Sequence, residues 1–221
     1  MFKNRIIILI YSMLIFSADC FGQISADQLV KGLGDKMNQI ESFEVDAVIK
    51  VDVEFINIKD REVRIKYQAP DQFIFDTKGL ALLPKNGMQM EFLSIINGEY
   101  VSIEAGNETI GNTITQIVKV IPESLDSDII LAQFWIDPIE SRIMRMKTFT
   151  RKSGSYMIEF EYESQDDFLP SRLVVAFEIS NMSIPIKMMN DFMQNSSTEA
   201  DSIPKQARVI VEYSNYKITT K

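Results

Sequence analysis

The sequence predicts a mainly β protein, built on a strongly curved antiparallel sheet or incomplete β-barrel with an N-terminal helix and apolar lid segments. Long stretches alternate apolar and charged residues with a period of two, as half-buried antiparallel strands do. One stretch near the start instead has the apolar spacing of a long helix. Strands and helices do not alternate along the chain, and this argues against a parallel sheet.

The predicted helix covers residues 26–40. Ser25 and Gln28 have the spacing of a capping box, which satisfies free backbone amides at a helix start. Gly32 and Gly34 are expected to weaken the helix locally. The apolar positions recur every three or four residues: Leu29, Val30, Leu33, Met37 and Ile40.

The first predicted strand covers residues 43–55, with Phe43, Val45 and Ala47 on one face and acidic or basic residues on the other. Roughly ten or eleven strands follow from this pattern, joined by turns such as Asn97-Gly98, Asp137-Pro138 and Ser153-Gly154. The remaining strands are predicted near 63–67, 73–75, 101–103, 117–121, 129–137, 143–150, 156–162, 173–179 and 209–213. Several strands are too long for a small sandwich, and their outward faces are densely charged. A curved sheet around an apolar interior meets both constraints, with the helix plugging or lining that interior.

Residues 79–96 and 181–204 interrupt the alternation. Both are long for hairpin connections and apolar for loops. They are rich in methionine, which packs adaptably, and we interpret them as apolar flaps over a cavity. Ordinary core packing is the alternative, and thioether binding of Cu(I) is a weaker one. The methionines concerned are Met88, Met90, Met182, Met188, Met189 and Met193.

The first residues have the layout of a secretory signal peptide. Lys3 and Arg5 precede an apolar run at 6–16, and small and polar residues follow. Cleavage after Gly22 would leave residues 23–221 as a single domain, with 181–204 as a flexible insertion. We therefore expect a secreted protein of the periplasm.

Cys20 offers a rival interpretation, in which it becomes a lipidated N-terminal cysteine. Asp19 is a poor fit to that interpretation, because a small neutral residue is wanted there. Cleavage after Gly22 would instead remove Cys20. The mature chain would then hold no thiol, as suits an oxidising compartment.

Composition excludes several kinds of chemistry. The 221 residues include one Cys and no His, so there is no Ser-His-Asp or Cys-His catalytic unit and no His-ligated zinc. A net charge of −8 argues against binding nucleic acid. Glu159, Glu161 and Glu163 alternate with apolar residues, which indicates a solvated strand face and not a catalytic pair. We expect no enzyme activity, no cofactor and no metal.

The order of several short motifs resembles the LolA-like family of periplasmic outer-membrane lipoprotein carriers. The helix ends at 40–43 and leads directly into the first strand. The remaining motifs are Tyr67-Gln68-Ala69-Pro70-Asp71-Gln72-Phe73, Ile96-Asn97-Gly98-Glu99-Tyr100-Val101, Phe134-Trp135-Ile136-Asp137-Pro138 and Leu169-Pro170-Ser171-Arg172. The resemblance covers most of residues 26–180. It implies an incomplete barrel that is closed by helices and holds acyl chains inside.

This resemblance implies a monomeric carrier or chaperone that moves lipoproteins or related lipids to the outer membrane, with inner- and outer-membrane sorting partners. Phe73 matches an aromatic position at the cavity. Ala69 stands where carriers have a basic residue that latches the lid, so the energy-driven handover is not implied for this chain. A lipid- or lipoprotein-sensing regulatory module on the same fold is the alternative, and a structural envelope protein with a filled core is another. The predicted ligand-binding residues are Val51, Phe55, Phe73, Phe75, Leu82, Leu83, Met88, Met90, Phe92 and Trp135.

Overall fold

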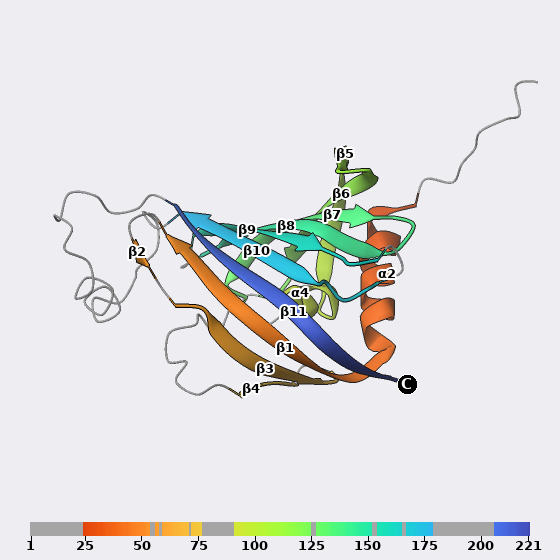
Figure 1. Cartoon of the computed structure of the whole chain (residues 1–221). Coiled ribbons are helices and arrows are strands. Elements are labelled where there is room, and N and C mark those ends of the chain that lie inside the picture. Colours follow the sequence, from red (N-terminus) through yellow and green to blue (C-terminus); the bar gives the residue numbers. More distant parts are fainter. Residues whose placement is uncertain are drawn as a thin grey trace, which may run out of the picture.

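Eleven strands form one antiparallel sheet, in the order β4-β3-β1-β11-β10-β9-β8-β7-β6-β5 with β2 paired to β1 (Figure 1). The computed structural model describes residues 24–53, 56–57, 59–70, 72–76, 91–124, 127–151, 154–164, 167–178 and 206–221. Within these, β4 and β5 are the two ends of the sheet and do not pair. The predicted fold class, a curved antiparallel sheet that does not close, is confirmed. The elements are α2 (Ala26–Asn38), β1 (Ile40–Val53), β2 (Ile56–Asn57), β3 (Arg61–Gln68), β4 (Gln72–Asp76), α4 (Glu91–Ile96), β5 (Tyr100–Ile110), β6 (Thr113–Pro122), β7 (Ile129–Asp137), β8 (Arg142–Thr150), β9 (Ser155–Glu161), β10 (Arg172–Glu178) and β11 (Gln206–Thr220).

The start of α2 has the capping box that the sequence predicts. The Gln28 backbone N–H donates to Ser25 Oγ at 3.2 Å, and the Ser25 backbone N–H donates to Gln28 Oε1 at 3.0 Å. The end differs from the prediction, because the helix stops at Asn38 and Ile40 already belongs to β1. Ile40 is buried all the same, so its apolar character does not distinguish the two elements.

The predicted hairpin turn at Asn97-Gly98 is wrong. These residues follow α4: the Asn97 amide donates to the Leu93 carbonyl, and the Gly98 amide donates to the Ile95 carbonyl. They therefore end a helix instead of joining two strands. The turn at Asp137-Pro138 is confirmed, and it links β7 to β8.

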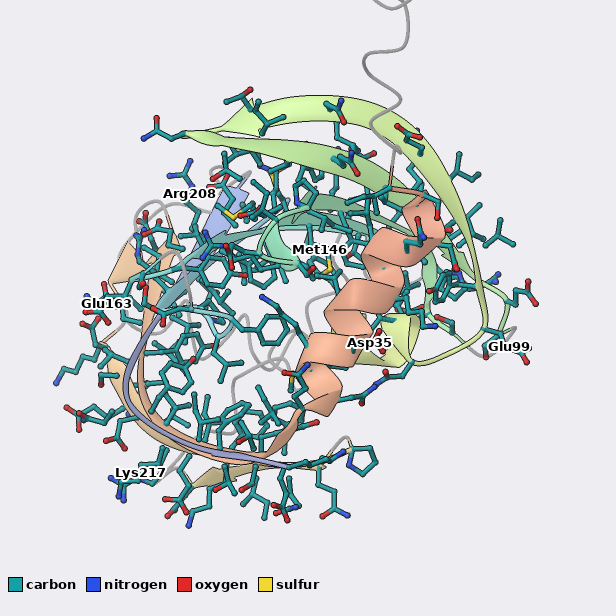
Figure 2. All side chains as sticks on the ribbon, turned by 90° about the vertical axis from the view of Figure 1, so that its right-hand side faces the viewer. Asp35, Glu99, Met146, Glu163, Arg208 and Lys217 are labelled. Carbon is teal, nitrogen blue, oxygen red and sulfur yellow. The ribbon has the colours of Figure 1, made fainter. Side chains whose placement is uncertain are left out.

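The two faces of the sheet differ sharply in chemistry. In Figure 2 the side chain of Met146 points into the interior, whereas Glu163, Arg208 and Lys217 point outward. The outer face carries ion pairs between neighbouring strands, such as Lys66 with Glu44. The alternation along the strands thus separates an apolar inner face from a charged outer face, as it does in half-buried sheets.

Helix α2 joins distant parts of the sheet. It packs against β1, β5 and α4, and Figure 2 shows it crossing between the β5–β6 pair and the lower curve of the sheet. Its buried side chains are Leu29, Val30, Leu33 and Met37. The helix therefore covers the inner face at one end of the barrel-like curve. No helix among the described residues combines the length and apolarity needed to span a bilayer.

Candidate functional site

Six aromatic rings form a continuous row on the inner face, across β4, β3, β1 and β11. We call these residues the aromatic row: Phe75, Phe73, Tyr67, Phe43, Tyr216 and Tyr213. The successive ring centroids lie 6.4, 4.9, 5.1, 6.0 and 6.1 Å apart. These spacings are those of favourable aromatic pairs.

Strand register produces most of this row. Phe43 on β1 lies opposite Tyr67 on β3, and Tyr67 lies opposite Phe73 on β4. Residues directly opposite on neighbouring strands share a face, so three strands contribute rings to one surface. Phe75 follows Phe73 by two positions and therefore keeps the same face.

A β-bulge adds the last two members. Tyr213 and Tyr216 are three positions apart, with Ser214 and Asn215 between them. In a regular strand their side chains would therefore point to opposite faces of the sheet. The pairing of β1 with β11 shifts at this point, and Asn215 adopts a φ of 58°. The bulge lets both tyrosine rings pack against the core.

The aromatic row is not uniformly buried. Phe43 and Tyr67 at its centre are fully buried, whereas Phe73, Phe75 and Tyr213 are half-buried. Half-buried aliphatic side chains continue the surface along the neighbouring strands: Leu173, Val175, Val209 and Val51. Val51, Val209 and Val175 are cross-strand neighbours on β1, β11 and β10. This surface is the candidate site.

The hydroxyl groups of the inner tyrosines are mostly taken up by backbone carbonyls. Tyr67 donates to Pro70 at 2.9 Å, Tyr162 to Ile143 at 2.7 Å, and Tyr216 to Pro170 at 2.8 Å. Burial raises the pKa of Tyr162, Tyr213 and Tyr216, because the phenolate form would be poorly solvated there. These tyrosines therefore stay protonated and act as hydrogen-bond donors.

The predicted site residues fall into several groups. The structure brings Phe73 and Phe75 together at the edge of the aromatic row, and it places Val51 on the adjoining aliphatic surface. Phe92 lies in α4, but its side chain is outside the described part. Outside the described residues lie Phe55, Leu82, Leu83, Met88 and Met90, together with the predicted insertion 181–204.

Trp135 is not with the others. Its cross-strand partner is Arg145, whose guanidinium lies 5.4 Å from the centroid of the indole ring, and its Nε1 donates to Glu108 Oε2 at 2.6 Å. Phe134 and Ile136, the residues on either side, belong to the hydrophobic cluster of the interior; Trp135 is also buried, at 6% exposed, but is not part of that cluster. Trp135 therefore faces outward, away from the surface where we predicted it.

Sequence reasoning missed Phe43, Tyr67, Tyr213 and Tyr216 as members of the site. Three of them stand at inward positions of alternating strands, so the period of two could have identified them. Tyr216 could not have been found in this way, because it depends on the bulge. The Ala69 side chain, at the position of the expected latch, is partly buried against the core.

The aromatic row and its aliphatic continuation, as far as the structure describes them, contain no charged side chain. Among the described residues, no group of three or more acidic, Cys or His side chains is placed to hold a metal ion. The carboxylates with a lowered pKa are on the outer face: Lys66 lowers the pKa of Glu44, and Arg64 lowers that of Asp46. The arrangement of the described inner face suits apolar binding.

The fold is similar to solved structures with little sequence identity. No protein-family model matches the sequence, and no curated protein is recognisably similar in sequence. A DUF1329 family protein from Desulfovibrio piger is 10% identical, with a TM-score of 0.60, covering 88% of this chain and 92% of that chain. A LolA superfamily protein from Nitrosomonas europaea is 10% identical, with a TM-score of 0.54 over 90% and 96% of the two chains.

A third similar structure is a putative outer membrane lipoprotein-sorting protein domain from Vibrio parahaemolyticus. It is 10% identical, with a TM-score of 0.57 over 89% of this chain and 94% of that chain. The LolA-like fold expected from the sequence motifs is therefore confirmed. At this identity the likeness establishes the fold alone.

Proposed function

We propose that the protein is a periplasmic carrier or chaperone, which binds acyl chains of lipoproteins or related lipids on the inner face of its sheet. The observation that carries the proposal is the half-buried end of the aromatic row, continued by Val51, Val175 and Val209. Lipid tails gain roughly 0.8 kcal/mol for each buried CH₂ group. An apolar surface of this kind can therefore hold a lipid reversibly without any covalent step.

The fold neighbours support the same direction. One of them is described as a putative outer membrane lipoprotein-sorting protein domain, and another as a LolA superfamily protein. Inner- and outer-membrane sorting proteins are the corresponding partners in our proposal. The signal peptide predicted at 1–22 supports the periplasm as the place of work.

The predicted flaps complete the proposal. Leu82, Leu83, Met88 and Met90 stand in the stretch between β4 and α4, so the chain leaves the aromatic row at Phe75 and returns to the core at Leu93. We propose that these residues, with Phe55 and Phe92, cover the bound chain. Ala69 stands where carriers have a basic residue that latches the lid. We therefore expect release of the bound lipid that does not depend on a latch at this position.

The test compares adjacent residues on opposite faces of β4. Phe73 is half-buried in the aromatic row, whereas the side chain of Ile74 is 61% exposed. The full chain is exported to the periplasm of a bacterial host, purified, and examined by native mass spectrometry for bound acyl chains. Binding of a synthetic diacylated lipopeptide is then measured by calorimetry.

We expect acyl chains to co-purify with the wild-type protein and with Ile74→Glu. Phe73→Glu should lose them and bind the lipopeptide more than about tenfold less tightly, because a carboxylate would be forced into the apolar surface. An empty wild-type protein that does not bind the lipopeptide would refute the proposal. Specific capture of one membrane protein by that empty protein would favour the regulatory alternative.

A further inference from the structure

We propose that the free edge of β5 binds an extended, basic peptide segment of a partner protein, which adds an antiparallel strand to the sheet. The inference goes beyond the proposed function, because this surface is the outer edge of the sheet and not the inner face that would hold lipid. β5 is one end of the sheet, and no described strand pairs with its other side. Residues 103–109 of this strand are all exposed. Long exposed edge strands are templates for pairing with another chain.

The backbone of β5 directs hydrogen-bonding groups toward this edge. The Glu123 N–H donates to the Glu99 carbonyl at 2.9 Å, so Glu99 directs its polar backbone groups toward β6. In an antiparallel pair, residues bonded to the neighbour alternate with residues whose N–H and C=O point away from it. Tyr100 and Ser102 therefore point to the free edge. Pro122, which lies opposite Tyr100, agrees with this assignment, because proline has no N–H to donate.

Three exposed aliphatic side chains lie beside that edge. We call Val101, Ile103 and Ile121 the edge strip, and they are 48%, 48% and 41% exposed. Val101 and Ile121 are cross-strand partners. Ile117 precedes Ile121 by four positions on β6 and lies opposite Trp135, which places the strip on the outer face. Elsewhere this face carries ion pairs between strands, so the edge strip is an exposed apolar surface typical of an interaction site.

The charges at this edge indicate a basic partner. Glu99 and Glu123 are exposed and lie opposite each other, next to the edge strip, and in Figure 2 Glu99 points away from the interior. Like charges directly opposite destabilise a strand pair. Within the described ranges, neither carboxylate pairs with a Lys or Arg side chain. A partner strand that brings Lys or Arg to this end of β5 would offset the repulsion.

A second copy of the chain fits this edge less well. β5 contains Glu104 and Glu108 and no Lys or Arg, so a second copy would add only further carboxylates. The register shift between Glu104 and Asn107, with a φ of 100° at Gly106, marks a β-bulge that ends regular pairing. We therefore expect a short partner segment, with aliphatic residues opposite Val101 and Ile103 and basic residues at both ends.

The experiment uses the peptide acetyl-Lys-Lys-Val-Thr-Val-Lys-Lys-amide, titrated into the isotope-labelled full chain and followed by NMR. Two derivatives carry one N-methyl group each. The first is methylated at Thr, whose N–H would bond to Ser102, and the second at a Val, whose N–H would point away from β5. A third derivative has Glu in place of every Lys.

We expect the parent peptide to bind and to slow hydrogen exchange at the Ser102 amide. Methylation at Thr should weaken binding more than about tenfold, whereas methylation at Val should leave the affinity within about twofold. The Glu peptide should not bind, and added salt should weaken the parent peptide. Glu99→Gln should weaken binding by about threefold.

Protein variants test the edge strip. Ile103→Thr should weaken binding of the parent peptide by about fivefold, because it removes one aliphatic cross-strand contact. The matched control is Ile218→Thr on β11, because Ile218 is similarly exposed, at 50%, and lies far from β5 in the strand order. The control should bind as wild type does.

Several results would overturn the inference and leave the proposed lipid binding untouched. These are no binding of the parent peptide, equal effects of the two N-methyl groups, or equal affinities of Ile103→Thr and Ile218→Thr. Sedimentation that finds wild type dimeric and Ile103→Thr monomeric would assign the edge to a second copy instead. The N-methyl comparison uses wild-type protein alone, so its result does not depend on how any variant folds.

Discussion

The indole of Trp135 on β7 donates a hydrogen bond of 2.6 Å to Glu108 on β5, two strands away on the outer face of the sheet. Arg145 on β8 completes the group: its Nη1 lies 3.0 Å from Glu108 Oε1, and its Nε lies 3.3 Å from Glu159 Oε1. These contacts join strands from β5 to β9. They also separate Trp135 from the inner surface that we propose for lipid.

Replacing Trp135 should affect stability and leave lipid binding unchanged. Trp135→Phe removes the hydrogen bond to Glu108 and shrinks a side chain that is only 6% exposed. We expect a loss of roughly 1–2 kcal/mol in the free energy of unfolding, measured with urea. The affinity for the diacylated lipopeptide should stay within about twofold of wild type. A much weaker affinity in a folded variant would place Trp135 back in the site.

The acid stability of the protein should depend on Glu108. The hydrogen bonds from Trp135 and Arg145 lower the pKa of Glu108 below its ordinary 4.5. The unfolded chain therefore takes up this proton at a higher pH than the folded chain does. The stabilisation is present above about pH 4.5 and is lost as the pH falls through the lowered pKa.

The variant Glu108→Gln tests the direction of this pH dependence, because it keeps an oxygen acceptor for the indole and removes the charge. We expect the melting temperature of Glu108→Gln to lie below that of wild type at pH 7. The two melting temperatures should approach each other as the pH falls from 5 to 3. Melting temperatures measured by circular dichroism across this pH range test the expected pH dependence. A difference that is constant with pH would show that the charge of Glu108 does not contribute.

The charge alternation of the strands made the fold predictable. Val45, Ala47 and Ile49 on β1 are buried, and the residues between them carry or contact charge at the surface. Shifting the register of such a strand by one residue would bury a row of acidic and basic groups. The inner face, and with it the place of Phe73, could therefore be deduced without coordinates.

Local pattern could not assign the face of Trp135. It stands between Phe134 and Ile136, so a run of apolar residues hides the alternation of β7. The contacts of Trp135 with Arg145 and Glu108 on neighbouring strands reveal that the indole faces outward. Tyr216 was hidden for a different reason, since it depends on a bulge at Asn215 that no alternation shows.

The buried ion pair at the β7–β8 turn should contribute strongly to stability. Asp137 Oδ2 lies 3.4 Å from Arg142 Nε, and both side chains are 6% exposed. Asp137 Oδ1 also accepts hydrogen bonds from the amides of Ile139 and Glu140. Asp137→Asn keeps an acceptor for the turn but leaves the guanidinium buried without its carboxylate. We expect a loss of about 3 kcal/mol in urea unfolding, with a further 1 kcal/mol or so for Asp137→Ala.

The control for this pair is an exposed one. Arg172 and Glu161 form a contact between β10 and β9, and the Glu161 side chain is 54% exposed. Glu161→Gln should change the unfolding free energy by less than about 1 kcal/mol, because water screens surface pairs. Equal losses for Glu161→Gln and Asp137→Asn would contradict the importance of burial.

The two glycines of α2 should respond differently to alanine. A Cβ on Gly34 would meet no heavy atom closer than 3.9 Å, from Asn97 Oδ1, which is ordinary contact. A Cβ on Gly32 would lie 3.3 Å from Ser141 Oγ, in the turn between β7 and β8. Ser141 has a φ of 48°, in the left-handed region that side chains seldom adopt, so the turn backbone has little freedom to move away.

Gly34→Ala should therefore raise the unfolding free energy by roughly 0.5–1 kcal/mol, the gain of alanine over glycine inside a helix. Gly32→Ala should gain less, or lose stability, because the helix approaches the turn closely at that point. The double change Gly32→Ala with Ser141→Gly removes the obstructing hydroxymethyl group and should recover most of the gain. Urea unfolding of the four proteins measures this coupling, and equal gains at Gly32 and Gly34 without the second change would refute it.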